Sequence, residues 1–510
     1  MKDSENLIWD QLRIPSAIPF APSSSSSSHF KTIPKFLFCF ILFLSLIYLL
    51  YSFKLLSSRD CHEGPFSTRL LSSRAAVPNL NVSESQQPQK PTELRHVVFG
   101  IAASSKLWEH RKKYIKLWYN STKMRGVVWL DDHVETHNDD GLPLVKISGD
   151  TSNFSYTHPL NHRAGIRISR IVSETLRLGM KDVRWFVMGD DDTVFFTDNL
   201  LRVLRKYDHN QFYYIGGSSE SHMQNIYLSY SMAFGGGGFA ISYPLAKALD
   251  KIQDHCIQRY PALYGSDDRI QACMAELGVP LTKELGFHQF DVHGNLLGLL
   301  AAHPVSPLVT MHHLDLVEPI FPNVTQIQAL ERLMTTPMKL DSASLMQQSI
   351  CYDKARSWTV SVSWGFAILI FRGLLPPREM ETPSRTFLNW HKKADFTGFP
   401  FNTRPVARNP CQKPFVFYLS NSTWLNSMTQ LSKQVIIVSE YQRHRAPHPE
   451  CRWKMTPPST IDIVKVYKKP DPHLWDRAPR RNCCRVKESP EIGILLVDVG
   501  VCEEGEVSEF

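Results

Sequence analysis

Residues 185–196 read WFVMGDDDTVFF, and this stretch decides the fold. The apolar run at residues 185–188 is typical of a buried strand, and three consecutive carboxylates follow its closing glycine. Adjacent carboxylates repel each other unless a cation neutralises them, so Asp190, Asp191 and Asp192 predict a divalent metal, Mn²⁺ or Mg²⁺. An acidic surface turn is the alternative for an isolated triplet, and the buried strand before it counts against that alternative.

Alternating strand and helix patterns surround this stretch. Short apolar runs at residues 97–101 and 127–130 predict two more buried strands. Between residues 168 and 176, apolar side chains recur at i, i+3, i+4, i+7 and i+8, which predicts an amphipathic helix that Gly179 ends. We therefore expect an α/β sheet layer, in which ligands bind at the carboxyl ends of the strands, where the acidic triplet stands.

A second acidic pair, Asp267 and Asp268, opens a predicted helix that Ser266 begins and Gly278 ends. The pair could do no more than interact favourably with the helix dipole. A carboxylate fixed at a helix start can, however, also act as general base on a hydroxyl. Four glycines separate the two acidic sites: Gly235, Gly236, Gly237 and Gly238. Because glycine has no Cβ, this run would let a ligand approach the backbone closely, and a flexible turn is the alternative.

Histidines further along the chain are candidates for the metal shell. The segment FHQFDVH supplies His288 and His293, and His312 and His313 are weaker candidates. An imidazole beside Asp192 would suit Mn²⁺, whereas an ordinary core or surface histidine is the alternative.

Residues 36–53 (FLFCFILFLSLIYLLYSF) carry no charge. A helix of this length is about 27 Å long, close to the roughly 30 Å hydrocarbon core, which predicts a single transmembrane anchor after a cytosolic tail, residues 1–35. A cleaved signal peptide is the alternative, and the long polar leader counts against it. Lys and Arg near the span number two before it and four after it, so the positive-inside rule does not support this orientation.

Glycosylation sequons give the orientation instead. Five N-x-S/T triplets follow the span: Asn81, Asn120, Asn153, Asn323 and Asn421. Nine of the ten cysteines also follow it, and both features are typical of a lumenal body, here held off the membrane by a stem at residues 54–93. Because nine is odd, at least one lumenal thiol would stay free or pair between chains.

The composition and the pattern of the sequence change near residue 321. Residues 358–371 and 415–420 are β-prone, prolines interrupt the rest, and six cysteines lie here, which predicts a β-rich, disulfide-bonded region at 321–510. The cysteines form no CxxC pair, which excludes zinc fingers and thioredoxin-like chemistry. Of the net charge of +8, residues 451–490 supply ten basic minus four acidic residues, or +6, so we expect no nucleic-acid partner.

The ordered motifs resemble those of the fringe-related glycosyltransferases of plants and, more distantly, fringe and the mucin-type β-1,3-galactosyltransferases. The resemblance covers residues 94–320. It rests on an Asp triplet after a strand, a GGxGFxxS segment, an acidic pair opening a helix and a Phe-His pair: residues 190–192, residues 235–242, Asp267 with Asp268, and Phe287 with His288.

The resemblance implies a GT-A fold, an α/β sandwich that binds a UDP-sugar with Mn²⁺. It implies that Asp192 and His288 hold the metal, and that Asp268, with Asp267 beside it, is the inverting base. The donor would contact the other motif residues: Asp190, Asp191, Gly236, Gly237 and Gly238. It further implies a β-1,3 linkage to a glycan, glycoprotein or cell-wall polysaccharide, and a single-pass type II protein of the Golgi membrane.

One position departs from the pattern of the more distant relatives, which have glycine four residues after the base, where this chain has Ala272. An inactive lumenal carbohydrate-binding or scaffold protein on the same fold is therefore the second hypothesis. A metal-dependent phosphodiesterase is the third, although that chemistry normally needs a richer set of His and Asp ligands for two metals.

Overall fold

The computed structural model describes residues 44–52, 90–135, 141–429, 432–446, 449, 451–452 and 455–507. Residues 44–52 are helical, and no helix in these ranges is long and apolar enough to cross a membrane. The predicted cytosolic tail, half of the predicted anchor (residues 36–43 and 53) and nearly all of the predicted stem lie outside the described residues. Two compact units divide the chain, Met1–Gln89 and Lys90–Phe510, and everything below concerns the second.

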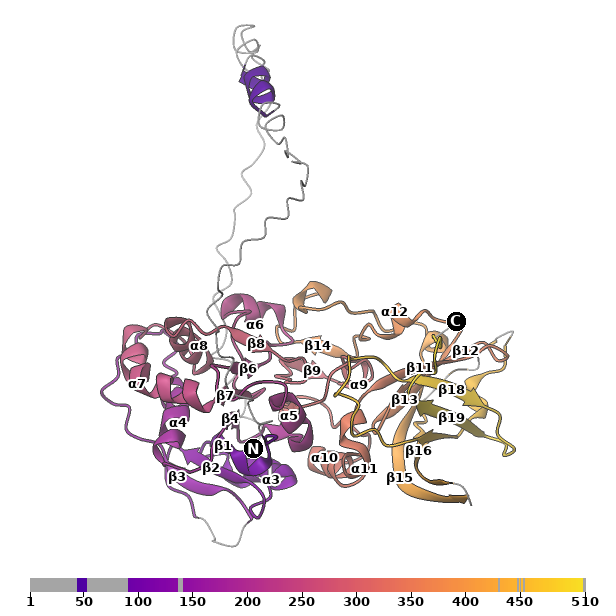
Figure 1. Cartoon of the computed structure of the whole chain (residues 1–510). Coiled ribbons are helices and arrows are strands. Elements are labelled where there is room, and N and C mark those ends of the chain that lie inside the picture. Colours follow the sequence, from indigo (N-terminus) through magenta and orange to yellow (C-terminus); the bar gives the residue numbers. More distant parts are fainter. Residues whose placement is uncertain are drawn as a thin grey trace, which may run out of the picture. The chain divides into compact units, whose positions relative to one another are not determined.

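A seven-stranded sheet forms the first half of this unit, in the order β3-β2-β1-β4-β7-β6-β8 (Figure 1). Its strands are β1 (Val97–Ala102), β2 (Arg125–Leu130), β3 (Leu144–Ile147), β4 (Trp185–Asp190), β6 (Tyr214–Gly216), β7 (Phe239–Ser242) and β8 (Leu281–Lys283). Strands β1 to β4 are parallel, whereas β7 is antiparallel to both β4 and β6. The acidic triplet therefore leaves the sheet at the carboxyl end of its middle strand, as the sequence predicts.

Helices cover both faces of this sheet. They are α3 (Trp108–Trp118), α4 (Ala164–Arg177), α5 (Thr197–Leu204), α6 (His222–Tyr227), α7 (Tyr243–Arg259), α8 (Asp267–Glu276) and α9 (Leu297–Leu300). Side chains alternate along each strand, so Phe186 packs on the side of α4, α7 and α8, while Val187 packs on the side of α3 and α5. The amphipathic helix predicted before Gly179 is confirmed as α4, and Gly179 has φ +67°.

Two short ribbons join distant parts of the chain. One pairs β5 (Val194–Phe195) with β10 (Thr310–Met311), and the other pairs β9 (Val292–Gly294) with β14 (Phe387–Asn389). Because β5 directly follows the acidic triplet, the first ribbon brings the residues after β10 to the same place. Because β14 belongs to the second half of the unit, the second ribbon links the two halves.

The second half contains an eight-stranded sheet, in the order β11-β12-β13-β15-β16-β17-β19-β18. Its strands are β11 (Gln348–Asp353), β12 (Trp358–Ser363), β13 (Ala367–Arg372), β15 (Phe415–Thr429), β16 (Ser432–Arg443), β17 (Ile463–Lys468), β18 (Cys483–Lys487) and β19 (Ile494–Gly500). The helices α10 (Gln326–Thr335), α11 (Pro337–Asp341) and α12 (Pro377–Met380) accompany it. The predicted β-character of residues 358–371 and 415–420 is thus confirmed.

The disulfide Cys351–Cys484 connects β11 and β18, which are the two edge strands of this sheet. The sheet therefore curls until its edges meet, and a covalent bond closes it. Three further disulfides are present: Cys256–Cys273, Cys411–Cys451 and Cys483–Cys502. All eight cysteines among the described residues are paired, and Cys61 lies outside the described residues.

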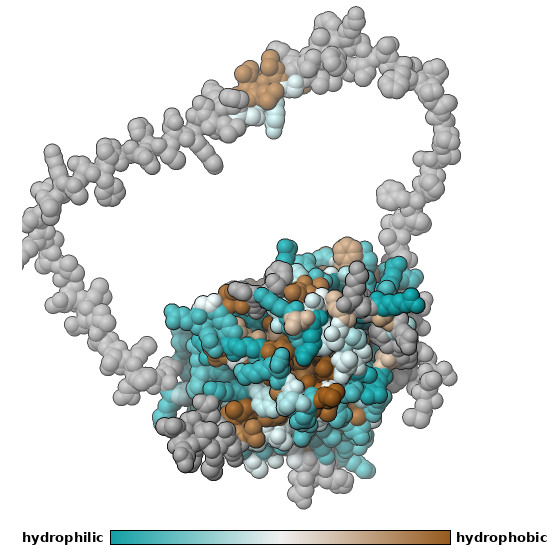
Figure 2. Space-filling view, turned by 90° about the vertical axis from the view of Figure 1, so that its right-hand side faces the viewer, coloured by the Kyte–Doolittle hydropathy of each residue, from teal (hydrophilic) through white to brown (hydrophobic). Residues whose placement is uncertain are grey.

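One apolar core runs through both halves of the unit. It joins Phe195 and Leu308, beside the first sheet, to Trp364 and Phe417 of the second half. The predicted regions 94–320 and 321–510 therefore share a single interior. The face that carries the second sheet shows apolar patches scattered among hydrophilic side chains (Figure 2).

Candidate active site

The guanidinium of Arg111, on the neighbouring helix α3, pairs with two acids of the triplet. Asp191 and Asp192 are 2% and 1% exposed, and the Arg111 guanidinium on α3 donates to Asp191 Oδ1 at 2.9 Å. The same guanidinium lies 3.2 Å from Asp192 Oδ2, and the backbone N–H of Ser104 donates to Asp191 Oδ2 at 3.2 Å. Asp190 differs, because its side chain is 36% exposed and can meet a ligand from solvent.

His312 completes a possible cation site with Asp190 and Asp192. Its Nε2 lies 3.2 Å from Asp192 Oδ1 and 3.7 Å from Asp190 Oδ2. Its Nδ1 faces the carbonyl oxygen of Gln289 at 3.2 Å, so Nδ1 carries the hydrogen that directs Nε2 toward the carboxylates. Both oxygens of Asp192 are buried without a hydrogen bond of good geometry, as expected of atoms that bind a cation. The residues present therefore fit Mn²⁺ or Mg²⁺.

The pKa values of these groups reflect crowding of like charges in a buried place. Burial and then the neighbouring acids raise the pKa of Asp190 to about 7, against the opposing effect of His312. Burial and Asp192 raise the pKa of Asp191 to about 6, against Arg111. Burial opposes ionisation of Asp192 as well, but His312 and Arg111 outweigh it and hold its pKa well below the usual range. Burial disfavours a charged His312, yet Asp192 raises its pKa to about 9.

The glycine run packs tightly against two side chains of the site. A Cβ on Gly236 would lie 2.1 Å from the His312 ring, and one on Gly235 would lie 2.5 Å from Asp267 Oδ1. Gly238 has φ +81°, which favours glycine. The predicted close approach to the glycine backbone therefore exists, but the side chains of His312 and Asp267 make it, in place of a ligand.

The two acids at the start of α8 have different surroundings. Asp267 lines a small pocket of about 20 Å³ together with Asp190 and Gly235, and burial raises its pKa to about 6. The side chain of Asp268 is 12% exposed, and its two oxygens accept the backbone N–H groups of Tyr264 at 2.8 Å and Gly265 at 3.0 Å. Asp267 thus lies beside Asp190, whereas the carboxylate of Asp268 is held by backbone N–H groups at the start of α8.

Two family models match this chain. The Fringe-like model matches residues 92–342, which hold the triplet, the glycine run, the acidic pair and His312. The model described as Protein of unknown function, DUF604, matches residues 224–484 and so extends into the second sheet. The chain belongs to a fringe-related glycosyltransferase family. No curated protein matches it.

The resemblance implies that His288 holds the metal with Asp192, but His288 does not lie beside Asp192 in this fringe-related site. Its Nδ1 is 3.0 Å from Glu220 Oε1 and its Nε2 is 2.9 Å from His303 Nε2, so both ring nitrogens are engaged away from Asp192. The imidazole beside Asp192 belongs to His312, which the sequence ranks lower. His293 is also absent from the cation group and stacks on Trp390.

Sequence reasoning missed Arg111 and ranked His312 below His288. Arg111 lies on the same face of α3 as the buried Trp108, Ile115 and Trp118, where no motif marks it. The pairing of β5 with β10 is what brings His312 to the triplet. A usable signal for His312 is the repeated histidine directly after a short apolar segment, residues 308–311. Ala272 is half-buried on α8.

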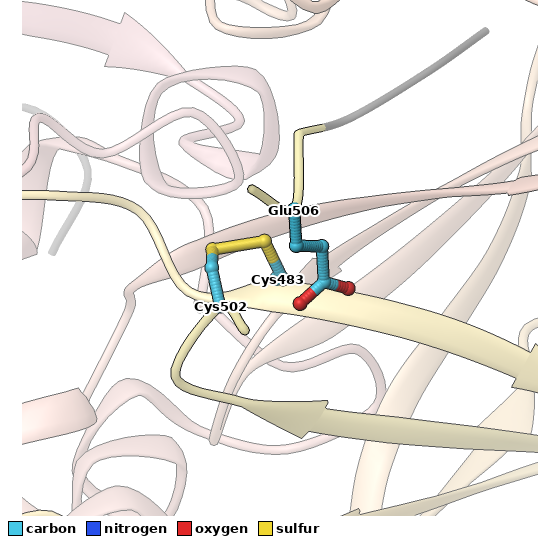
Figure 3. A group of neighbouring side chains, drawn as sticks. All are labelled: Cys483, Cys502 and Glu506. Carbon is cyan, nitrogen blue, oxygen red and sulfur yellow. A yellow bond between two sulfur atoms is a disulfide. The ribbon is translucent and has the colours of Figure 1, made fainter. Parts of the chain in front are cut away.

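A second group of potential metal ligands is not a metal site. Cys483, Cys502 and Glu506 lie close together, but the two sulfur atoms are bonded to each other (Figure 3). A disulfide leaves no thiolate to bind a metal. Among the described residues, the aspartate–histidine group is therefore the better cation site.

We expect the thermal stabilisation that Mn²⁺ gives to be larger at about pH 7.5 than at about pH 5.5. The raised pKa values mean that the folded, metal-free protein holds protons on Asp190, Asp191 and His312 at the lower pH, and a cation must displace them. Melting curves with and without Mn²⁺ at both pH values measure this difference. Asp190→Asn should reduce it, and an equal stabilisation at both pH values would contradict the site.

Proposed function

We propose that this chain moves a sugar from a UDP-sugar to a hydroxyl group of a glycan, glycoprotein or cell-wall polysaccharide, with inversion at the anomeric carbon. The observation that carries the proposal is the joint presence of Asp190, Asp192 and His312, with both oxygens of Asp192 buried and paired only with the charged Arg111 and His312. Membership of a fringe-related glycosyltransferase family supports the reaction class.

Asp192, Asp190 and His312 would hold the cation. When bound, Mn²⁺ supplies positive charge that stabilises the departing diphosphate. Arg111 contributes by keeping Asp192 ionised from the other side, so the carboxylate keeps its charge while buried. The exposed edge of Asp190 and the pocket that it shares with Asp267 offer polar contacts to the donor.

Asp268 is the proposed base. A base for an acceptor from solvent must stand where that acceptor can reach it, and the Asp268 side chain keeps 12% of its surface exposed. The two backbone N–H groups fix its carboxylate, and each oxygen keeps a further lone pair for a proton. As Asp268 takes the proton, the acceptor oxygen bonds to the anomeric carbon, the bond from that carbon to the UDP oxygen breaks, and UDP leaves.

The proposed setting is the Golgi lumen, with the chain as a single-pass type II protein and a β-1,3 linkage in the product. The five sequons and the four disulfides support a body that folds in an oxidising, glycosylating compartment.

UDP release by the full chain in detergent, across a panel of UDP-sugars with acceptors and with or without Mn²⁺, tests the function. We expect a cation-dependent signal for one donor. Binding of UDP and Mn²⁺ without turnover of any donor would instead favour the carbohydrate-binding protein, to which Ala272 gives some support.

A further inference from the structure

A segment of the second half reaches the active site. This strap, residues 384–391, contains β14 and pairs antiparallel with β9, so that Leu388 faces His293 (Figure 1). Thr386 fastens it, because its hydroxyl accepts the Gly298 N–H at 2.9 Å and donates to the Asn295 carbonyl at 2.7 Å. A Cβ on Gly298 would lie 1.8 Å from the Ser384 carbonyl oxygen, so the two segments touch backbone to backbone.

The strap places Trp390 against two imidazoles of the first half. The indole stacks on His293 at 5.2 Å between ring centroids with a 7° interplanar angle, and on His313 at 5.0 Å with a 12° angle. Both imidazoles therefore lie nearly parallel to the indole. These contacts point to a role for Trp390 in holding the two histidines.

His313 transmits this contact to the cation site. Its ring lies 3.9 Å from that of His312, centroid to centroid, and its Nδ1 lies 3.0 Å from Asp291 Oδ1. The backbone of His313 has φ 52°, a left-handed conformation that a non-glycine residue keeps only when its surroundings hold it. Trp390 on one side and Asp291 on the other provide that hold. The neighbouring His312 takes its direction toward Asp192 from the same backbone.

We propose that Trp390 is a positioning residue through which the second half of the chain fixes His312 for the cation. The role rests on the proposed function, since it concerns the cation of that site. It also gives the second half a part in the site, because the Fringe-like match ends at residue 342 and so does not include Trp390, the side chain on which His313 stacks. Outer partners of metal-binding histidines typically change metal affinity by about 10- to 100-fold when removed.

Mn²⁺ titration of the full chain, followed by the electron paramagnetic resonance of free Mn²⁺, tests the proposal. We expect Trp390→Leu, which fills space without a planar ring, to weaken Mn²⁺ binding by about 10- to 100-fold. Trp390→Phe, which keeps an aromatic ring, should stay within about threefold of the wild type. The matched control is Trp424→Leu, because Trp424 on β15 is 46% exposed and lies in the second sheet.

A second readout does not depend on the leucine variant folding. Bound Mn²⁺ is paramagnetic and quenches a nearby indole, so part of the tryptophan quenching in the wild type should disappear in Trp390→Phe. Wild-type affinity in Trp390→Leu, or unchanged quenching in Trp390→Phe, would overturn the role of Trp390. A wild type that binds no Mn²⁺ would overturn the cation site itself and, with it, this role.

Discussion

Asp192→Asn is expected to lower kcat/KM for sugar transfer by about 10³-fold and to weaken Mn²⁺ binding. A metal that stabilises developing charge contributes several kcal/mol to the transition state, and each 1.36 kcal/mol corresponds to about tenfold in rate. Asp192 is the acid that both Arg111 and His312 face, and both of its oxygens are buried. Asparagine has a similar shape but offers no charge to the cation.

The measurement is UDP release at varied donor concentration, with Mn²⁺ affinity determined on the same samples. Asp132→Asn is the matched control, because Asp132 is an exposed acid just beyond β2, the strand next to β1. The control should keep wild-type activity. If Asp192→Asn binds Mn²⁺ and turns over donor like the wild type, the cation site lies elsewhere.

Asp268→Asn is expected to lower kcat by about 10²- to 10⁴-fold while leaving the affinities for UDP and Mn²⁺ unchanged. Loss of a positioned general base typically has this size, and an amide cannot take the acceptor proton. Asparagine still offers one oxygen to the backbone N–H groups of Tyr264 and Gly265, so the start of α8 should stay folded.

Asp267→Asn is the informative comparison. Because Asp267 lies inside the pocket with Asp190, its replacement should raise KM for the donor more than it lowers kcat. The opposite pattern, with kcat lost in Asp267→Asn and retained in Asp268→Asn, would exchange the two roles. Full activity in both variants would show that neither acid takes part in the reaction.

Local patterns in the sequence predict much of the first sheet. The strands β1, β2 and β4 and the helices α4 and α8 each carry their own periodicity and end signals, so neighbouring residues suffice to find them. The acidic triplet and the acidic pair are visible for the same reason. Each is a cluster of like charges at the end of an element, and its position follows once the element is known.

The imidazole of the cation site depends on contacts between distant segments, which local patterns do not contain. His312 reaches Asp192 only because the two-residue strands β5 and β10 pair, and strands this short leave almost no periodic signal. The same limit hides Trp390, whose place follows from the equally inconspicuous β9–β14 ribbon. Both ribbons pair residues far apart along the chain, whereas the motif that favours His288 is local.

The Cys351–Cys484 bond has a consequence for how the chain is made. Its two cysteines are 133 residues apart in the sequence, so the later one, on β18, is translated long after the first. Until β18 has been translated, β11 lacks the strand that lies against its edge in the folded chain, and an uncovered edge strand invites pairing with other chains. A premature stop before residue 484 would therefore leave a chain with a complete acidic triplet and a lone reactive thiol, dependent on chaperones and prone to aggregation.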